Sequence, residues 1–194
     1  ASPASFQPVK AARSTASFKT GCSLHSTCST EKRLSADLAI RTMKTLTEDK
    51  AMPIEISICE SVDEIVVAAF ERLIPQLSSS SSLPTAEQLV EILDHDASTV
   101  LLAKDGDTIV GSMTLIVFQI PTGIRAWIED VVVDEQARGK GVGEALNQRA
   151  MEIAMKAGAK TIDLTSRPSR EAANRLYQRL GFKARDTNIY RYEA

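Results

Sequence analysis

The chain has 194 residues, of which 43% are hydrophobic and 25% charged, and a formal net charge of −2; these values are typical of one soluble globular domain. A mildly acidic body argues against a nucleic-acid partner, which would require a basic face, and no apolar run reaches the about 18–20 residues of a membrane helix. Three cysteines (Cys22, Cys28, Cys59) and two histidines (His25, His95) lack the spacing of a disulfide framework or a zinc site. We therefore expect no nucleic-acid partner, no membrane segment and no metal.

Residues 1–51 differ in composition from the rest of the chain. The first thirty contain seven Ser, four Thr and three basic residues but no acid, which resembles an organellar transit peptide and equally a disordered leader or a sequence added for expression. Residues 34–46 could form a short helix, and Met52 reads as a natural start, with Met43 as a second candidate. We divide the chain into an extension without a catalytic role (1–51) and a folded domain (52–194). We expect a cytoplasmic location, with organellar targeting by residues 1–30 as the alternative.

From residue 54 the pattern is that of regular secondary structure. Apolar residues alternate with polar ones over 54–58, which predicts a half-buried strand, and residues 62–77 have helical spacing. Five consecutive serines, 78–82, predict a polar loop, after which Thr85 can cap a helix that runs to about residue 93. The sequence Lys-Asp-Gly-Asp at 104–107 predicts a hairpin turn between strands at 99–103 and 108–119.

The second half continues with strands and helices in alternation. We expect a strand at 124–133 and a helix from about 141 to 156 that ends at Gly158 in a left-handed cap. A short strand at 161–165, a helix at 169–180 and a closing strand at 188–192 follow. Tyr190 and Tyr192 on the closing strand are expected in the core or an interface.

A glycine-rich loop joins the predicted strand 124–133 to the helix after it. Gly139, Gly141 and Gly143 leave the backbone almost bare where the helix begins, and the free N–H groups there, with the positive end of the helix dipole, favour a phosphate group. A P-loop is excluded because Lys140 is followed by Gly141 and not by Ser or Thr, and the spacing of a dinucleotide fingerprint is also absent.

Two motifs resemble the GNAT superfamily of N-acetyltransferases, bacterial type. Residues 136–141, Gln-Ala-Arg-Gly-Lys-Gly, fit its acetyl-CoA pyrophosphate motif Gln/Arg-x-x-Gly-x-Gly. Residues 172–182, with an Asn, a Leu-Tyr pair and a closing Gly-Phe, look like its later helix. The resemblance covers about residues 54–194. It implies an α/β (α+β) fold with a mixed, mostly antiparallel central sheet and helices on both faces, and acetyl-CoA as co-substrate without a metal.

The resemblance also implies roles for individual residues. Backbone N–H groups of the preceding strand would polarise the thioester carbonyl, Asn174 would contact the pantetheine arm, and Tyr177 would donate a proton to the sulfur. The implied cofactor-binding residues are Val131, Val132, Val133, Arg138, Gly139, Lys140, Gly141, Val142, Gly143 and Asn174.

The attacking amine needs a base, for which Glu129 and Asp130 are the candidates. Strand alternation gives Trp127, Glu129, Val131 and Val133 one face and Ile128, Asp130 and Val132 the other, so that only one carboxylate can face the acceptor. We choose Glu129 because the similar diamine and glucosamine-phosphate acetyltransferases carry a Glu-Asp pair at this distance from the loop. The alternative is a structural hydrogen bond within the sheet.

These residues favour an enzyme that transfers an acetyl group from acetyl-CoA to a primary amine of a small molecule or peptide, by direct attack in a ternary complex. A non-catalytic acyl-CoA-binding or sensor module is the alternative. Arg167, Arg170 and Arg175 could bind an acidic acceptor or the ribose phosphate of CoA, or form a solvated helix start. A homodimer is possible.

Overall fold

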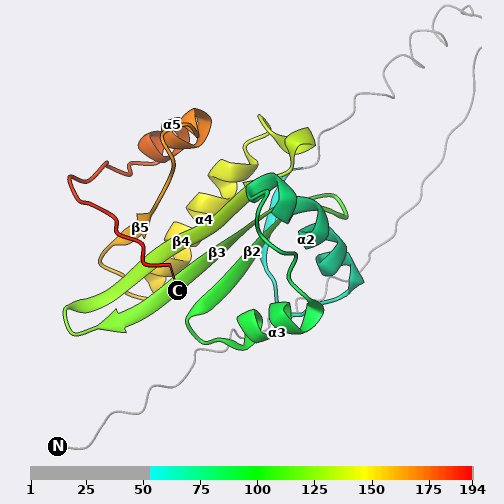
Figure 1. Cartoon of the computed structure of the whole chain (residues 1–194), viewed down its shortest axis with the longest axis horizontal. Helices are drawn as coiled ribbons and strands as arrows, with labels where there is room; N and C mark the ends of the chain where they lie inside the picture. The colour runs from blue at the N-terminus through cyan, green and yellow to red at the C-terminus, as the bar shows by residue number, and fades with distance from the viewer. Residues whose placement is uncertain (1–52, 194) are drawn as a thin grey trace, which may run out of the picture. The chain divides into compact units, whose positions relative to one another are not determined.

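A computed structural model describes residues 53–193 (Figure 1). Its core is a five-stranded sheet in the order β1-β2-β3-β4-β5. The strands are β1 (Glu55–Ile58), β2 (Ser98–Asp105), β3 (Thr108–Ile120), β4 (Gly123–Val133) and β5 (Ile162–Leu164). Neighbouring strands from β1 to β4 are antiparallel, whereas β5 runs parallel to β4. The predicted extension 1–51, including the possible helix at 34–46, lies outside the described residues.

The helices begin and end close to where the sequence predicts. They are α2 (Glu64–Leu77), α3 (Ala86–Asp94), α4 (Val142–Lys156) and α5 (Glu171–Arg179), with a short 3₁₀ helix η1 (Glu135–Ala137). Asp63 caps α2 by accepting a hydrogen bond from the Val66 N–H at 2.8 Å. Thr85 and Gln88 form a reciprocal capping box at the start of α3. Local capping chemistry therefore fixes the residue at which each of these two helices begins.

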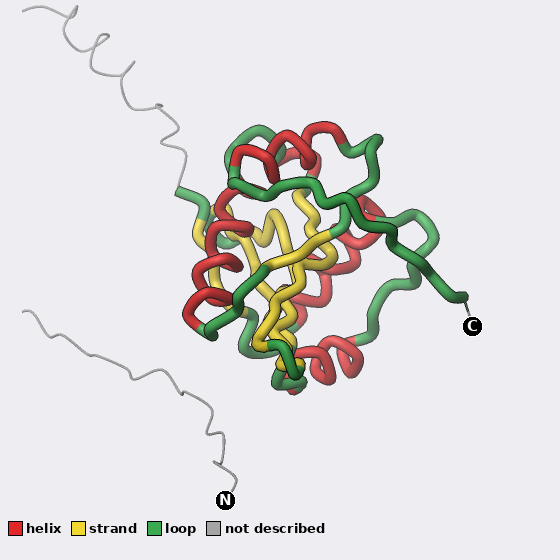
Figure 2. The backbone as a smooth tube through the Cα atoms, turned by 90° about the vertical axis from the view of Figure 1, so that its left-hand side faces the viewer, coloured by secondary structure: helices red, strands yellow, loops and turns green. Residues whose placement is uncertain are grey.

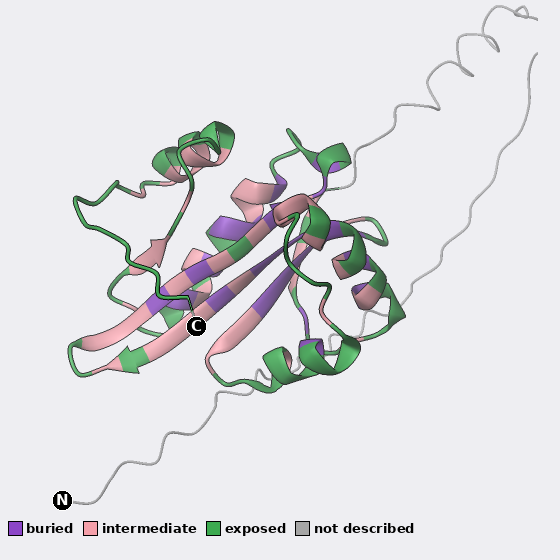
Figure 3. Ribbon diagram, viewed as in Figure 1, coloured by how far each residue is buried: buried purple, intermediate pink, exposed green. Residues whose placement is uncertain are grey.

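Helices cover both faces of the sheet, as the sequence predicts (Figure 2). On one face α4 buries Val142, Leu146, Ala150 and Ala154 against the sheet. On the other, α2 buries Val66, Ala69 and Leu73. The buried residues follow the central strands, and the outer sides of the helices are exposed (Figure 3). The mixed, mostly antiparallel α/β fold is confirmed.

A β-bulge interrupts β4 and corrects the predicted strand alternation. Ser112 pairs with Val132 and Thr114 with Glu129, so Met113 of β3 lies opposite two residues, Asp130 and Val131. Asp130 has a positive φ of 52°, a conformation that non-glycine residues rarely adopt. The extra residue reverses the side-chain alternation beyond it.

The core confirms this reversal. Ile128 and Val131, three residues apart, both pack on the α4 face, whereas Val132 packs on the α2 face. Glu129 follows Ile128 and so points to the α2 face, with Val132. Glu129 therefore does not share a face with Val131 and Val133, and the prediction that it does is wrong.

The predicted closing strand at 188–192 is also wrong for the described chain, where residues 183–193 form no strand. Ile189, Tyr190 and Tyr192 are 72%, 87% and 93% exposed, so neither tyrosine belongs to the core. The residue pattern of this segment is compatible with a strand, but β5 has only three residues paired with β4 and offers a short edge for any further strand.

Candidate active site

β4 and β5 separate halfway along β4. Their parallel pairing covers Ala126 to Ile128 of β4, and the remainder of β4 continues to Val133 while the chain after β5 turns away toward α5. The bulge lies at this point. Bulges next to functional sites re-aim side chains and end strand pairing, and here two cavities adjoin the bulged stretch of β4.

The first cavity, which we call the loop cavity, has a volume of about 850 Å³. It lies between the end of β4, the glycine loop with the start of α4, and one side of α5. The predicted cofactor-binding residues that line it are Val131, Val132, Val133, Arg138, Gly139, Gly141, Val142 and Gly143.

The glycines of the loop are suited to a phosphate group. Gly139 and Gly141 both have φ of +81°, and a β-carbon at either position would meet no atom of the described chain within 4 Å. Packing therefore does not require glycine there; the backbone conformation does, and it leaves open space beside the start of α4. Gly143 has a different reason, because a β-carbon there would lie 3.2 Å from Leu176 of α5.

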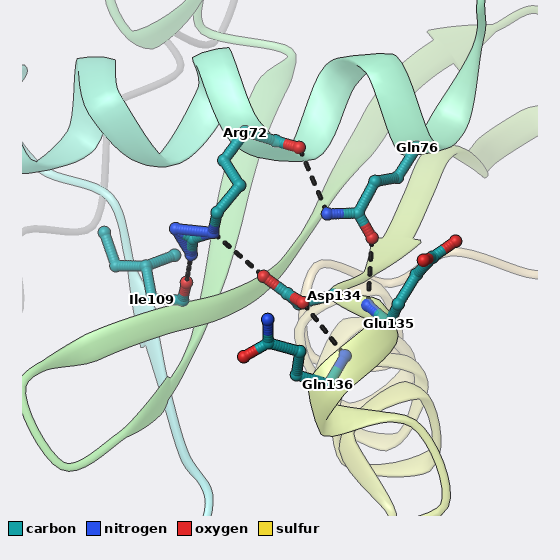
Figure 4. Close-up of polar contacts among 6 residues, drawn as sticks. All are labelled: Arg72, Gln76, Ile109, Asp134, Glu135 and Gln136. Atoms are coloured by element: carbon teal, nitrogen blue, oxygen red, sulfur yellow. Dashed lines mark hydrogen bonds and ion pairs between the residues drawn. The ribbon is translucent and has the colours of Figure 1, made fainter.

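A polar cluster anchors the segment that leads into the loop (Figure 4). Arg72 of α2 pairs with Asp134 through its Nε at 2.9 Å, and its Nη2 donates to the carbonyl of Ile109. The second carboxylate oxygen of Asp134 accepts from the Gln136 N–H at 3.0 Å, and the Gln76 side chain accepts from the Glu135 N–H at 2.9 Å. Asp134 is buried. We call Arg72, Gln76 and Asp134 the loop anchor.

The second cavity, the α2–β4 cavity, has a volume of about 760 Å³. Its walls come from α2, the serine loop, α3, the bulged part of β4, the segment between β5 and α5, and the C-terminal segment. Glu129 and Asp130 both line it, so the prediction that only one carboxylate can face this space is wrong. Alternation fails here because the bulge turns Asp130 out of the regular strand conformation.

The two cavities share one wall. Residues that line both are Leu77, Val131, Val132, Arg170 and Tyr177. Arg170 also donates from Nη2 to the carbonyl of Leu77 at 2.9 Å, which connects the start of α5 to the end of α2. A molecule in one cavity could therefore meet a molecule in the other next to Tyr177 and the bulge.

Tyr177 is oriented by packing against Phe182, with the rings edge to face and 6.0 Å apart. Burial raises the pKa of the Tyr177 phenol above its usual value, and the charge of Arg170 lowers that pKa in part. The hydroxyl consequently keeps its proton at neutral pH, as a proton donor must.

Glu129 is half-buried, and its Oε1 accepts a hydrogen bond from the Trp127 indole N–H at 2.5 Å. This contact fixes the orientation of the carboxylate, and its other oxygen has no hydrogen-bond partner among residues 53–193. Asp130 is exposed. The hydrogen bond is compatible with a positioned base and with the structural alternative.

A sequence model of the acetyltransferase (GNAT) family matches residues 61–182, which is most of the described chain. The chain belongs to the GNAT family of acetyltransferases. Over 71 residues it is 34% identical to N-alpha-acetyltransferase 30 of Schizosaccharomyces pombe, a match that covers 37% of this chain and 47% of that protein. Over 61 residues it is 36% identical to an uncharacterised N-acetyltransferase of Methanocaldococcus jannaschii, covering 31% and 27%. The matches thus span less than half of either relative.

Among solved structures, the chain is similar to an aminoglycoside acetyltransferase from an uncultured soil metagenomic sample, in complex with trehalose. The TM-score is 0.64 at 19% identity, with 73% of this chain and 96% of that chain covered. At this identity the likeness shows a shared fold.

In this GNAT domain, the side chains of two predicted cofactor-binding residues, Lys140 and Asn174, bind other groups of the protein. Lys140 pairs with Asp105 at 2.9 Å, and the Asn174 side chain donates to the carbonyls of Arg167 and Pro168 at 3.0 and 3.4 Å. Neither Lys140 nor Asn174 is among the residues that line the loop cavity. Arg138 lines it and lies 3.5 Å from Glu135.

The loop anchor is the feature of the GNAT domain that the sequence does not reveal. Two of its residues, Arg72 and Asp134, form an ion pair although they are 62 positions apart, and no motif connects them.

Within residues 53–193, no group of three or more His, Cys, Asp or Glu side chains has the arrangement of a metal site. None of the described helices combines the length and hydropathy that a membrane crossing needs.

Proposed function

We propose that the chain transfers the acetyl group of acetyl-CoA to a primary amine, by direct attack while both substrates are bound. The observation that carries this proposal is the wall shared by the two cavities. Direct attack requires two binding spaces that meet at one point, and the loop cavity meets the α2–β4 cavity at Tyr177, beside the bulge in β4.

In this proposal the loop cavity takes the CoA part of acetyl-CoA. The N–H groups from Arg138 to Gly143 and the start of α4 hold the pyrophosphate, and the open space beside Gly139 and Gly141 supports this assignment. Backbone N–H groups of the Val131–Val133 segment polarise the thioester carbonyl. Asn174 contacts the pantetheine arm, for which its side chain has to leave the carbonyls of Arg167 and Pro168.

The α2–β4 cavity then takes the amine. The neutral amine attacks the carbonyl carbon, a C–N bond forms and the C–S bond breaks. Glu129 takes the proton that the nitrogen loses, and the Tyr177 hydroxyl protonates the departing thiolate. Burial keeps the Tyr177 hydroxyl protonated, so that it has a proton to donate, and the hydrogen bond from Trp127 supports a fixed orientation for Glu129.

The acceptor is a small molecule or a peptide. The names of the similar proteins include one of each kind, an N-alpha-acetyltransferase and an aminoglycoside acetyltransferase. The competing proposal is a non-catalytic acyl-CoA-binding module, in which Glu129 and Tyr177 would be dispensable. We further propose that residues 52–194 suffice for this function, in the cytoplasm, with a homodimer possible.

The experiment is an amine panel with acetyl-CoA, read as release of free thiol. We expect amine-dependent release, and a decrease in kcat of about 10²–10⁴-fold for Tyr177→Phe and for Glu129→Gln with acetyl-CoA affinity retained. Tyr192→Phe and Glu152→Gln are matched controls on exposed residues outside both cavities. Tight acetyl-CoA binding without thiol release for any amine would favour the non-catalytic module. Loss of activity in Asp130→Asn but not in Glu129→Gln would transfer the base role to Asp130.

A further inference from the structure

The ionised side chains of the α2–β4 cavity are separated by sign. Its two carboxylates, Glu129 and Asp130, are neighbours at the bulge of β4. Its three arginines are Arg167 and Arg170, between β5 and α5, and Arg191 in the C-terminal segment, all of them exposed. One wall of the cavity is thus negative and another positive.

These arginines differ from most of the others because no carboxylate pairs with them in the described chain. Residues 53–193 contain ten arginines, and six of them pair with carboxylates: Arg72, Arg138, Arg149, Arg175, Arg179 and Arg185. Of the remaining four, three line the α2–β4 cavity. Arg170 is engaged with the Leu77 carbonyl. Arg167 and Arg191 therefore keep their guanidinium groups free of any carboxylate in the described chain.

Acetyl-CoA does not account for these two groups. The glycine loop opens into the loop cavity, which has cationic residues of its own in Arg138, Arg175 and Arg179. Arg167 and Arg191 line only the α2–β4 cavity. The anion that would pair with them is consequently a part of the acceptor and not of CoA.

We propose that the acceptor is a primary amine that also carries an anionic group, a carboxylate or a phosphate. Arg167 and Arg191 bind the anion, and the amine lies beside Glu129 and Asp130, next to the wall shared with the loop cavity. Guanidinium groups match the planar or tetrahedral oxygen arrangement of such anions with paired hydrogen bonds. This inference rests on the proposed function and narrows its substrate class.

The test is calorimetric binding of matched amine pairs to the full chain loaded with CoA, which requires no turnover. One pair is an amino acid and its carboxamide, and the other is phosphoethanolamine and ethanolamine. We expect the anionic member of at least one pair to bind about tenfold or more tightly than the neutral member. The pair that shows the preference distinguishes a carboxylate from a phosphate.

Arg167→Gln and Arg191→Gln should each reduce this preference several-fold without changing the affinity for acetyl-CoA. Arg149→Gln is the matched control, because Arg149 is exposed on α4, pairs with Glu152 and lines neither cavity. Equal binding within both pairs, no binding of any anionic amine, or a preference that survives both substitutions would overturn the inference. Thiol release with neutral amines at equal rates would overturn it too while leaving the acetyltransferase proposal intact. Binding of anionic amines without thiol release would instead contradict the acetyltransferase proposal.

Discussion

Tyr177 lines both the loop cavity and the α2–β4 cavity and packs against Phe182. Its hydroxyl is therefore less solvated than that of a surface tyrosine. Removal of water disfavours the phenolate, and this effect on the pKa is larger than the opposite effect of Arg170. Because the pKa in the folded chain exceeds the unfolded value, burial of the neutral phenol stabilises the fold below the unfolded pKa. This contribution is lost as the pH rises through the folded pKa.

We predict that Tyr177 ionises at a higher pH than a solvent-exposed tyrosine, because burial raises its pKa. The measurement is the difference between the ultraviolet phenolate titrations of the native chain and of Tyr177→Phe. The free energy of unfolding of the native chain should also fall relative to that of Tyr177→Phe as the pH rises beyond this point. A difference titration with its midpoint at or below that of a solvent-exposed tyrosine would show that Arg170 outweighs burial.

A second residue-scale prediction concerns Gly141. Its φ of +81° makes any side chain strained, and a β-carbon would extend into the open space assigned to the pyrophosphate. Gly141→Val should therefore weaken acetyl-CoA binding by at least about 2–3 kcal/mol, measured by calorimetry on folded protein. Gly158→Ala is the control for strain alone, since Gly158 has a similar φ of +85° at the other end of α4. A variant at Gly141 that binds like the native chain would refute the pyrophosphate assignment.

At the scale of elements, α2 both packs on the sheet and holds the segment before the glycine loop. Its apolar side packs on the sheet through Val66, Ala69 and Leu73. Its last turns carry Arg72 and Gln76, which hold the segment before the glycine loop. The position of the loop therefore depends on the docking of a helix that is distant in sequence and contributes no motif of its own.

We predict that Arg72→Met lowers the free energy of unfolding by about 1–3 kcal/mol, because it leaves the Asp134 carboxylate, 11% exposed, without its guanidinium. Acetyl-CoA affinity should fall with it, since Asp134 also holds the Gln136 N–H. Denaturant unfolding and calorimetry measure the two effects. Arg149→Met, which removes an exposed pair on α4, should change stability by less than about 0.5 kcal/mol and leave binding unchanged. Equal effects of the two substitutions would mean that the anchor does not position the loop.

At this scale, the sequence predicts the elements whose ends depend on interactions between residues close in sequence. The cap at Thr85 and the hairpin at 104–107 each depend on a few consecutive residues, and the structure confirms the elements that they bound. The bulge at Asp130 has no such signal, because aspartate rarely has positive φ and no glycine marks the position. The anchor and the missing closing strand depend on partners that lie far away in sequence, where periodicity carries no information.

At the scale of the whole molecule, the family match covers residues 61–182 and lies entirely within the proposed domain 52–194. The core clusters of the described chain contain residues on both sides of the sheet from Ile54 onward. The resemblance to bacterial-type members and the roles of Glu129 and Tyr177 stay predictions.

We predict that a chain beginning at Met52 folds and binds acetyl-CoA like the full chain. The melting temperature should change by less than about 2 °C, which corresponds to less than about 1 kcal/mol for a domain of this size. Thermal unfolding with and without acetyl-CoA measures both properties. A large fall in the melting temperature would assign the extension a structural role.

The wall shared by the two cavities has a thermodynamic consequence. Leu77 and Arg170 join the end of α2 to the start of α5, so a ligand that orders this connection from one side changes the free energy of filling the other side. Such coupling is reciprocal at equilibrium: whatever factor CoA contributes to amine affinity, the amine must contribute to CoA affinity. In the proposed function a single coupling factor therefore applies to CoA and to the amine, and we expect a substitution at Arg170, which lines both cavities, to change that factor equally for the two ligands.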